Sequence, residues 1–409
     1  MRNYHTFYGE MSMRRWVIQT LKRETILVIA SILAIVSCFI VHPDKEYLGY
    51  IHTHTIGQLI CLMLVVAGMQ RIGVFRIIGA KMLSHARTPR FLVLIFIGLT
   101  FFSSMLITND VALVTFVPFA IAVLIMAHME DKTVITVTLM TLGANLGSML
   151  TPVGNAHNLY LAAKTEMHIG QFLLIMIPYS GMAAILLIIA TFIFFSDKQI
   201  PGFEGLDSDT IERHILAPEI EKEQPDEIRI TGYGAGYGGW RLYVYIALFI
   251  VCLLAVSGII PLWAMIAVCF GVFFLTDRRA FKHVDWGLPL TFVAFFIFIG
   301  NMRRVPEFYT LAANLVQIDP LDVAVGSSQL ISNVPTTLLL ASFSNNWHAL
   351  IVGTNLGGMG TLIASMASLV SFKAVTARYP EKKRNYLGVY TVMNVVFLAI
   401  LLGLAHLLV

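Results

Sequence analysis

Long apolar runs separated by short polar stretches dominate this chain of 409 residues. Runs of about 17–25 apolar residues match the thickness of a bilayer core, so they predict membrane helices. The pattern predicts such helices over residues 25–41, 54–70, 133–163, 171–195, 242–256, 260–276, 287–302, 348–372 and 386–408. Two further runs, 91–126 and 306–344, contain a polar break near the middle. We expect each of these to fold back as a re-entrant hairpin that turns at Asn109 or Asn333.

Two of the predicted helices are interrupted by variations of one polar sequence. Gly143-Ala-Asn-Leu-Gly-Ser-Met-Leu-Thr151 returns 210 positions later (353 − 143) as Gly353-Thr-Asn-Leu-Gly-Gly-Met-Gly-Thr361. Each copy lies where a membrane helix would otherwise be uniformly apolar, so each predicts a broken helix. Interrupted hydrophobic segments at corresponding places in two halves indicate the binding site of a secondary transporter.

The composition agrees with a membrane protein, since 57% of the residues are hydrophobic, 13% are charged and the mean hydropathy is +0.77. A soluble domain carries about 25% charged residues. We therefore expect an all-α polytopic membrane protein. The net charge of +4 does not indicate a nucleic-acid partner, because the basic residues lie in short loops. The four cysteines fall inside apolar runs without metal-ligand spacing, and we interpret them as small buried hydrophobes.

The basic residues predict the orientation, because short cytoplasmic loops are enriched in Lys and Arg. With a cytoplasmic N-terminus, all the basic clusters are cytoplasmic only if both broken runs return to the side that they entered. The clusters are Arg14/Arg15/Lys22/Arg23, Arg71/Arg76/Lys81/Arg87/Arg90, Arg278/Arg279/Lys282 and Lys373/Arg378/Lys382/Lys383/Arg384. The first hairpin then opens to the cytoplasm and the second to the outside, as in an inverted repeat. Arg303 and Arg304 are an exception near the outer end of a helix.

This scheme divides the chain into four parts: a cytoplasmic N-terminal segment (1–24), a first membrane repeat (25–195), a cytoplasmic linker (196–241) and a second membrane repeat (242–409). Run 25–41 is interpreted as a retained first helix, because no small-residue cleavage site follows it. The linker contains a GxGxxG pattern from Gly234 to Gly239. A nucleotide site would need a preceding strand and a βαβ unit, so we interpret this stretch as a flexible linker.

Four polar clusters, namely the two hairpin tips and the two broken helices, supply the candidate binding residues. Unwound backbone inside a membrane must line a cavity or be buried in protein. Its free carbonyls suit cations, its free amides suit anions, and Asn, Ser and Thr side chains suit either. The predicted substrate-binding residues are Thr108, Asn109, Asn155, Asn158, Ser332, Asn333, Thr336 and Thr337. The predicted ion-binding residues are Asn109, Asp110, Gly143, Asn145, Gly147, Thr151, Gly154, Asn333, Gly353, Asn355, Gly357 and Thr361. Close helix packing is an alternative for the small residues Gly358, Gly360, Ser365 and Ser368, but it fits the asparagines poorly.

Two titratable residues adjoin these clusters. Asp110 is a carboxylate placed deep in the membrane, which by default suggests a function. It could carry a proton or neutralise a bound sodium ion, or it could cap the following half-helix. His157 stands where the second half has Ala367. It could bind substrate or relay protons, but a helix-end histidine bonded to a carbonyl is the interpretation we favour.

With these motifs, the chain resembles the ion transporter superfamily, which includes sodium/dicarboxylate symporters, arsenite permeases and one class of sodium/proton antiporter. The superfamily pattern is a Ser-Asn-Thr tip on each hairpin and a broken helix rich in Gly, Pro, Thr and Asn. Ser332-Asn333 keeps two positions of that tip, Thr108-Asn109 is a close variant, and Thr151-Pro-Val-Gly154 resembles a Thr-Pro-Ile-Gly stretch. The resemblance covers roughly residues 25–195 and 242–408.

The resemblance implies about eleven membrane segments including the two re-entrant hairpins, a homodimer, and elevator-type movement of a transport domain against a scaffold. Ions would lie between each tip and its broken helix and substrate between the tips, where Asn109 and Asn333 match the contacting asparagines. Where sodium/dicarboxylate symporters place Thr in the tips, this chain has Asp110 and Val334, and the four clusters contain no Arg or Lys. A carboxylate there disfavours a dianion unless a cation or proton intervenes, which looks more like the arsenite-permease branch.

The sequence therefore predicts a secondary active transporter for a small anion or oxyanion, coupled to Na⁺ or H⁺, in a bacterial inner membrane. A Na⁺/H⁺ antiporter and an arsenite-type efflux permease are the alternatives. The expected partners are the anion, the lipid bilayer and a second copy of the chain; no cofactor beyond the coupling ion and no nucleic acid is expected. An enzyme is disfavoured because no nucleophile–base pattern stands out.

Overall fold

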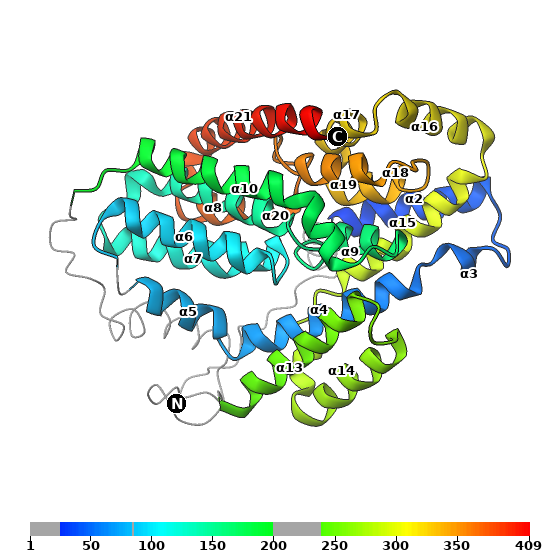
Figure 1. Ribbon diagram of the computed structural model, residues 1–409, viewed down its shortest axis with the longest axis horizontal. Helices are drawn as coiled ribbons and strands as arrows, with labels where there is room; N and C mark the ends of the chain where they lie inside the picture. Colours follow the sequence, from blue (N-terminus) through cyan, green and yellow to red (C-terminus); the bar gives the residue numbers. More distant parts are fainter. Residues whose placement is uncertain (1–24, 84–85, 199–238) are drawn as a thin grey trace, which may run out of the picture.

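The computed structural model describes residues 25–83, 86–198 and 239–409, and these ranges form helices without a β-strand (Figure 1). The predicted N-terminal segment and most of the predicted linker, with nearly all of its glycine-rich stretch, lie outside the described residues. The helices of the first half are α2 (Thr25–Ile40), α3 (Tyr47–Tyr50), α4 (Thr53–Arg71), α5 (Val74–Leu83), α6 (Pro89–Ser104), α7 (Asn109–Met126), α8 (Thr133–Ser148), α9 (Ala156–Lys164) and α10 (Ile169–Phe194).

The helices of the second half are α13 (Gly239–Val256), α14 (Leu262–Thr276), α15 (Gly287–Arg303), α16 (Pro306–Ile318), α17 (Pro320–Ile331), α18 (Asn333–Leu340), α19 (Trp347–Leu356), α20 (Met366–Arg378) and α21 (Lys383–Leu408). Short 3₁₀ turns at Glu130–Lys132, Arg278–Lys282 and Pro380–Lys382 precede α8, α15 and α21. Since α13 begins at Gly239, the helical part of the second half starts slightly before the predicted end of the linker.

Five helical segments in the described part of the chain are long and apolar enough to cross a membrane: α4, α7, α10, α13 and the segment containing α21. A sixth is formed by α15 and α16 if this pair, bent by 102°, counts as one broken span. The prediction of an all-α polytopic membrane protein is thereby confirmed. The total of about eleven segments and the re-entrant course of the hairpins stay predictions.

Both predicted broken helices are interrupted, but later than expected: the first part of each repeated sequence, 143–148 and 353–356, stays helical, and the helix ends only after it. The first break separates α8 from α9 over residues 149–155, and the second separates α19 from α20 over residues 357–365. Both polar tips also interrupt helix. The helices α6 and α7 pack against each other on either side of residues 105–108, and α17 and α18 do so around Ser332. Ser332 has φ +73°, a left-handed conformation that allows the chain to reverse within one residue.

The predicted hairpin over 306–344 needs a correction, because this run forms three helices. α16 bends away from α15, and the folded-back pair begins only at Pro320. Asp319 makes this boundary: its Oδ1 accepts the backbone N–H groups of Leu321 at 2.8 Å and Asp322 at 3.2 Å and so caps α17. Because the cap lies within a mostly apolar run, hydropathy alone merged α16 with α17. The short helices α3 and α5 were also missed.

The two broken helices lie at the centre of the fold. Every residue of α8 except Ile135 is buried, and α19 is buried from Ala349 to its end. α8 packs against α6, α7, α10, α20 and α21, which enclose it from several sides. By contrast, α2, α10 and α21 carry rows of exposed large apolar side chains, as expected for surfaces that face lipid. Polar residues on α8 and α19 must therefore find their partners inside the protein.

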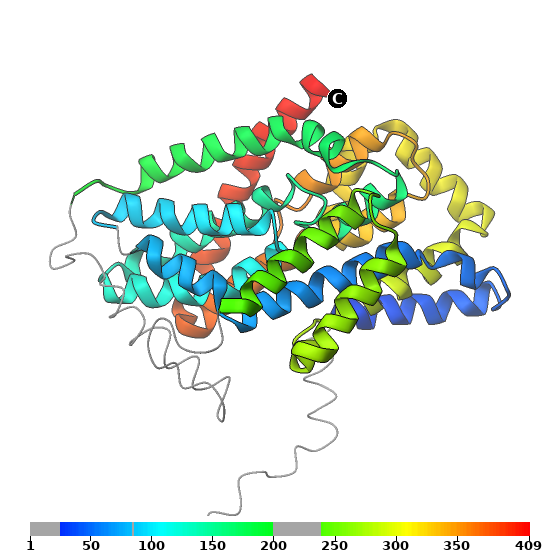
Figure 2. The same ribbon diagram turned by 60° about the horizontal axis from the view of Figure 1, so that its bottom comes forward.

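A second group of helices lies beside this centre, where α13 and α14 pack along α4 (Figure 2). Its polar end is held by Asp277, which pairs with Arg71 and accepts a hydrogen bond from Tyr245 Oη at 3.0 Å. Cys252 and Cys269 are fully buried in this group with their sulfur atoms 3.7 Å apart. The prediction that the four cysteines are buried is confirmed for Cys61, Cys252 and Cys269, whereas Cys38, in α2, is only partly buried.

The basic pair that violates the predicted orientation is partly neutralised in the fold. Arg304 forms ion pairs with Asp44 at 2.7 Å and Glu46 at 3.5 Å, both in the loop after α2. Its hydrogen bond to Asp44 holds the pKa of that carboxyl below its ordinary value. Because the orientation rule counts Lys and Arg and not net charge, this pairing leaves Arg303 and Arg304 as an exception to the predicted orientation.

Candidate functional site

The first tip is tied to the first broken helix by side chains from both. Asn109, the first residue of α7, donates from Nδ2 to Asn145 Oδ1 at 2.9 Å, while its own Oδ1 accepts the N–H of Asp110 at 3.0 Å. In the break, Thr151 Oγ1 donates to the carbonyl of Met105 at 2.5 Å and accepts the N–H of Gly154 at 3.0 Å. Thr108 precedes α7 in an extended conformation.

The second tip is tied to the second break in the same manner but by different residues. Ser332 Oγ and Asn333 N both donate to the carbonyl of Ala364, at 3.3 and 3.0 Å. Gln329 donates from Nε2 to the carbonyls of Gly357 and Met359 at 3.0 and 2.8 Å. Gln329 was not among the predicted site residues, although an amide three residues before the tip in an apolar run is a usable signal.

Predicted residues of the second half contribute to the contact between the second tip and the second break, or bond within α18. Thr361 is exposed and uses both its N–H (2.8 Å) and its hydroxyl (3.1 Å) on Gln329. Thr337 Oγ1 donates to the carbonyl of Asn333 at 2.7 Å. Gly360 has φ +103°, and a Cβ there would collide with the Gln329 side chain, so this position requires glycine.

Two hydrogen-bonded bridges join the two halves of the chain. In the first, Asn145 of α8 accepts from Ser365 Oγ at 3.2 Å and donates to Ser368 Oγ at 3.4 Å. In the second, Asn355 of α19 donates to Asn158 Oδ1 at 2.7 Å and accepts from Asn158 Nδ2 at 3.0 Å. Both serines of the first bridge therefore do more than permit close packing.

The two bridges are equivalent under the 210-residue offset. Adding the offset converts Asn145 into Asn355 (145 + 210 = 355) and Asn158 into the position of Ser368 (158 + 210 = 368). The helix contacts follow the same exchange, since α7 of the first tip packs against α20 while α18 of the second tip packs against α9. The helix that follows each tip therefore contacts the second segment of the other half's broken helix, which is α20 for the first tip and α9 for the second.

The predicted ion-site glycines lie where a broken helix touches one arm of its folded-back pair. A Cβ on Gly143 or Gly147 would press on α6, and one on Gly353 or Gly357 would press on α17. At Gly147 and Gly357 that Cβ would lie 2.6 Å from a serine Oγ of the neighbouring helix. The structure therefore gives these glycines a packing role, and backbone coordination of an ion at them stays a prediction.

Polar atoms without a partner remain next to the bridges. Asp110 Oδ1, Thr336 Oγ1 and both ring nitrogens of His157 are buried and have no hydrogen-bond partner in the described part of the chain. The expected carbonyl bond of His157 is therefore wrong. Asp110 Oδ1 makes no cap at the start of α7. Asn155 is the N-cap residue of α9 and is buried.

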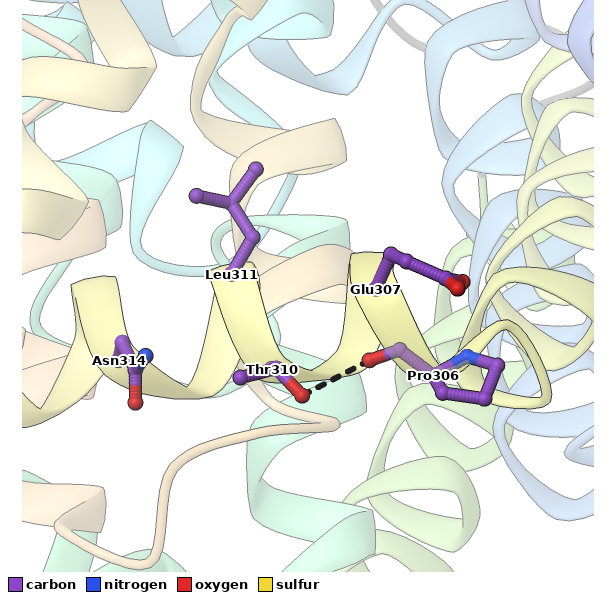
Figure 3. Close-up of a pocket in the computed structure, with 5 residues that line it drawn as sticks. All are labelled: Pro306, Glu307, Thr310, Leu311 and Asn314. Atoms are coloured by element: carbon purple, nitrogen blue, oxygen red, sulfur yellow. Dashed lines mark hydrogen bonds between the residues drawn. The ribbon is translucent and has the colours of Figure 1, made fainter.

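Two surface features lie apart from this centre. A groove of about 510 Å³ is lined by Pro306, Glu307, Thr310, Leu311 and Asn314 (Figure 3). All five residues belong to α16, so the groove is an open helix face and contains none of the predicted site residues.

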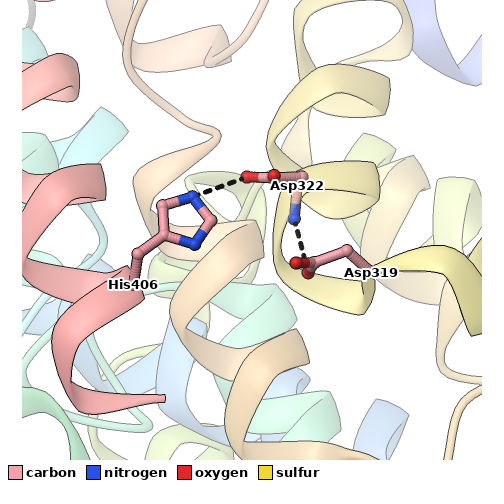
Figure 4. Close-up of side chains that lie close together, drawn as sticks. All are labelled: Asp319, Asp322 and His406. Atoms are coloured by element: carbon pink, nitrogen blue, oxygen red, sulfur yellow. Dashed lines mark hydrogen bonds and ion pairs between the residues drawn. The ribbon is translucent and has the colours of Figure 1, made fainter.

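The second surface feature is a cluster of Asp319, Asp322 and His406 at the ends of α17 and α21 (Figure 4). His406 Nε2 lies 3.2 Å from Asp322 Oδ1, and both side chains are about half exposed. Such ligands could hold a divalent cation, but Asp319 Oδ1 is already used to cap α17.

The chain is similar to one protein family and to several known proteins. The model of the family described as citrate transporter (CitMHS) matches residues 15–348. The inner membrane protein YbiR of Escherichia coli (strain K12) is 28% identical over 348 residues, which cover 84% of this chain and 85% of that protein. An uncharacterized transporter of Methanocaldococcus jannaschii is 29% identical over 337 residues, 82% of this chain and 84% of the relative. An uncharacterized transporter of Mycobacterium tuberculosis is 22% identical and covers 76% of each chain.

Proposed function

Because this chain belongs to the citrate transporter family, we propose that it is a secondary active transporter that moves a small anion or oxyanion, coupled to Na⁺ or H⁺. The family is one of transporters and two of the relatives are named as uncharacterized transporters, so the protein is a multi-pass membrane transporter and not an enzyme. The inner membrane is the proposed location, with a cytoplasmic N-terminus. A carboxylate such as citrate is the first substrate to test, in view of the family's description.

The pair of equivalent bridges is the observation that supports this proposal most. Transporters built from two related halves bind their cargo where interrupted helices of the two halves meet. The bridges Asn145–Ser368 and Asn158–Asn355 lie at such a meeting of broken helices, next to both tips. We infer an inverted repeat with re-entrant tips, because a twofold relation exchanges the two bridges and the two tip contacts together.

The same contacts favour an elevator-type movement. Hydrogen bonds across the halves join both tips and both broken helices into one body. The α4–α13–α14 group, packed separately along α4, is our candidate for part of the scaffold. A homodimer would hold two scaffolds together in the membrane while the transport bodies move. Cargo favours this movement only if it binds the two states with different affinities.

Within this body we assign the anion to the side chains around Asn109, Asn158, Asn333 and Thr336, between the tips. The coupling ion is assigned to Asp110 and to the amide oxygens of Asn145 and Asn355. Oxygen ligands of this kind suit a hard cation. A partly buried carboxylate whose Oδ1 is buried without a partner is stabilised by either a proton or Na⁺, so Asp110 is the proposed coupling residue.

Asp110 also favours a second candidate function, a Na⁺/H⁺ antiporter. The four polar clusters contain a carboxylate but no Arg or Lys, which suits a cation better than a dianion. An arsenite-type efflux permease is compatible with the same charge pattern, because its substrate carries little charge.

Transport by purified protein in liposomes tests these functions. We expect citrate or another small anion to be taken up or released only when a Na⁺ or pH gradient is imposed. Asn333→Ala should abolish this flux, and Asn314→Ala, an exposed asparagine of α16, is the matched control and should leave it unchanged. A Na⁺-dependent pH change without any anion would favour the antiporter. Gradient-independent leakage of every solute would refute secondary active transport.

A further inference from the structure

His157 is a buried histidine whose two ring nitrogens make no well-formed hydrogen bond in the described part of the chain, and its nearest polar neighbour is Asn355. Its side chain is 0% exposed, and neither ring nitrogen has a partner in the described part of the chain. A neutral imidazole always carries one N–H donor and one acceptor, so both functions are unused here. Buried polar groups in native proteins are nearly always paired. An imidazole with both functions unused is therefore a candidate contact for a ligand.

The polar side chain next to His157 is already committed elsewhere. Asn355 lies beside the imidazole, but its amide group donates to Asn158 Oδ1 at 2.7 Å and to the carbonyl of Ile351 at 2.8 Å. Its Oδ1 accepts from Asn158 Nδ2 at 3.0 Å. The bridge between the halves thus holds Asn355 in place and leaves the imidazole free for another partner.

The position of His157 favours an anionic ligand. It is the second residue of α9, where the first turn of a helix carries partial positive charge and free N–H groups. The helix α18 packs against α9 and contributes Thr336, another buried hydroxyl without a partner. With no Arg or Lys in the four polar clusters, an imidazole and a hydroxyl are suitable donors for an oxyanion.

We propose that His157 is a specificity residue that donates a hydrogen bond directly to a carboxylate or oxyanion substrate, with Thr336 as a second donor. This inference rests on the proposed function, which it deepens by naming the anion-contacting group. The second half has Ala367 at the corresponding position. The anion therefore binds off the pseudo-twofold axis, on the side of α9.

Three variants in nanodiscs separate this role from that of a merely structural histidine. His157→Leu removes both nitrogens at similar volume, and His157→Gln restores a donor. Tyr379→Phe, which removes a buried unpartnered hydroxyl at the end of α20, is the matched control. The readouts are the melting temperature of the ligand-free protein and the Kd for citrate, phosphate, sulfate and arsenite, measured separately.

We expect His157→Leu to melt at a higher temperature than the wild type, because an unpaired buried group is removed, and yet to bind the anion roughly 10–100-fold more weakly. His157→Gln should recover part of the affinity, and Tyr379→Phe should keep all of it. If the wild type binds an anion and His157→Leu binds it equally well, this inference is wrong while the proposed function stands. If the wild type binds none of the anions, the proposed function itself is refuted, and this inference with it.

Discussion

The bridge between Asn158 and Asn355 makes a quantitative prediction about what joins the two halves. These residues exchange two hydrogen bonds of 2.7 and 3.0 Å, although 197 positions separate them in the chain. Replacing either one by alanine removes both bonds and leaves a buried amide partly unpaired. We expect each single variant to lower the free energy of unfolding by about 2–3 kcal/mol.

The free energy that the bridge itself contributes is measured by the coupling energy between the alanine replacements of Asn158 and Asn355. Hydrogen bonds between membrane helices contribute about 0.6 kcal/mol on average and up to about 1.7 kcal/mol. Two reciprocal bonds of good geometry should therefore give a coupling energy of roughly 1–2 kcal/mol. The equivalent bridge from Asn145 to Ser368, with a single bond of 3.4 Å, should couple by less than about 0.5 kcal/mol.

Double-mutant cycles, measured by reversible unfolding in mixed micelles, test whether the coupling energy of Asn158 and Asn355 exceeds that of Asn145 and Ser368. Trp347, the first residue of the helix that carries Asn355, provides a fluorescence signal. Asn301→Ala, which breaks a bond to Ser37 Oγ at 2.9 Å, is the control partner for Asn355→Ala, and the two effects should add. A coupling energy near zero for Asn158 and Asn355, or a larger one for Asn145 and Ser368, would contradict the geometry.

Three further predictions concern packing, coupling and pH. Gly147→Ala should destabilise the protein by about 1–3 kcal/mol in the same unfolding assay, because the new Cβ collides with α6; Gly98→Ala, with open space around its Cβ, should be neutral or slightly stabilising, and equal effects would refute the packing role. Asp110→Asn should change the dependence of flux on the Na⁺ or pH gradient in liposomes, and wild-type coupling would remove Asp110 from the mechanism. Arg304→Gln should lower the melting temperature at neutral pH, because Asp44 has a lowered pKa and its pairing stabilises the protein above the ordinary value of 3.8. That difference should vanish as the pH falls through the lowered pKa of Asp44, and a difference that persists in strong acid would refute the ion pair as its cause.

The positions of the helices followed from the sequence because hydropathy is a local property. An apolar run long enough to cross a bilayer forms a helix wherever it occurs, and a polar, glycine-bearing interruption ends it. The ends of helix at Asn109 and Asn333 were therefore placed correctly, and the breaks at 149–155 and 357–365 were placed within several residues, because 143–148 and 353–356 stay helical. The boundary at Asp319 was not, because a single capping carboxylate hardly changes the hydropathy of its run.

The choice of partners was beyond the sequence, because it depends on how distant helices pack. The repeat selected Asn145 and Asn355 as important, yet nothing in it says that each binds the far part of the other half's broken helix. Gln329 became visible only when its contacts with the second break were known. His157 was read as a helix-end residue with a carbonyl partner, and the fold leaves it without one.

The sequence by itself thus determined a membrane-embedded helical fold with two polar interruptions in each half, since water-to-lipid transfer acts on each segment separately. Tertiary structure alone decided which polar groups satisfy one another and which remain unpaired at the centre. That distinction follows from geometry, because a hydrogen bond forms or fails within a few tenths of an ångström, whereas burial is averaged over a whole helix.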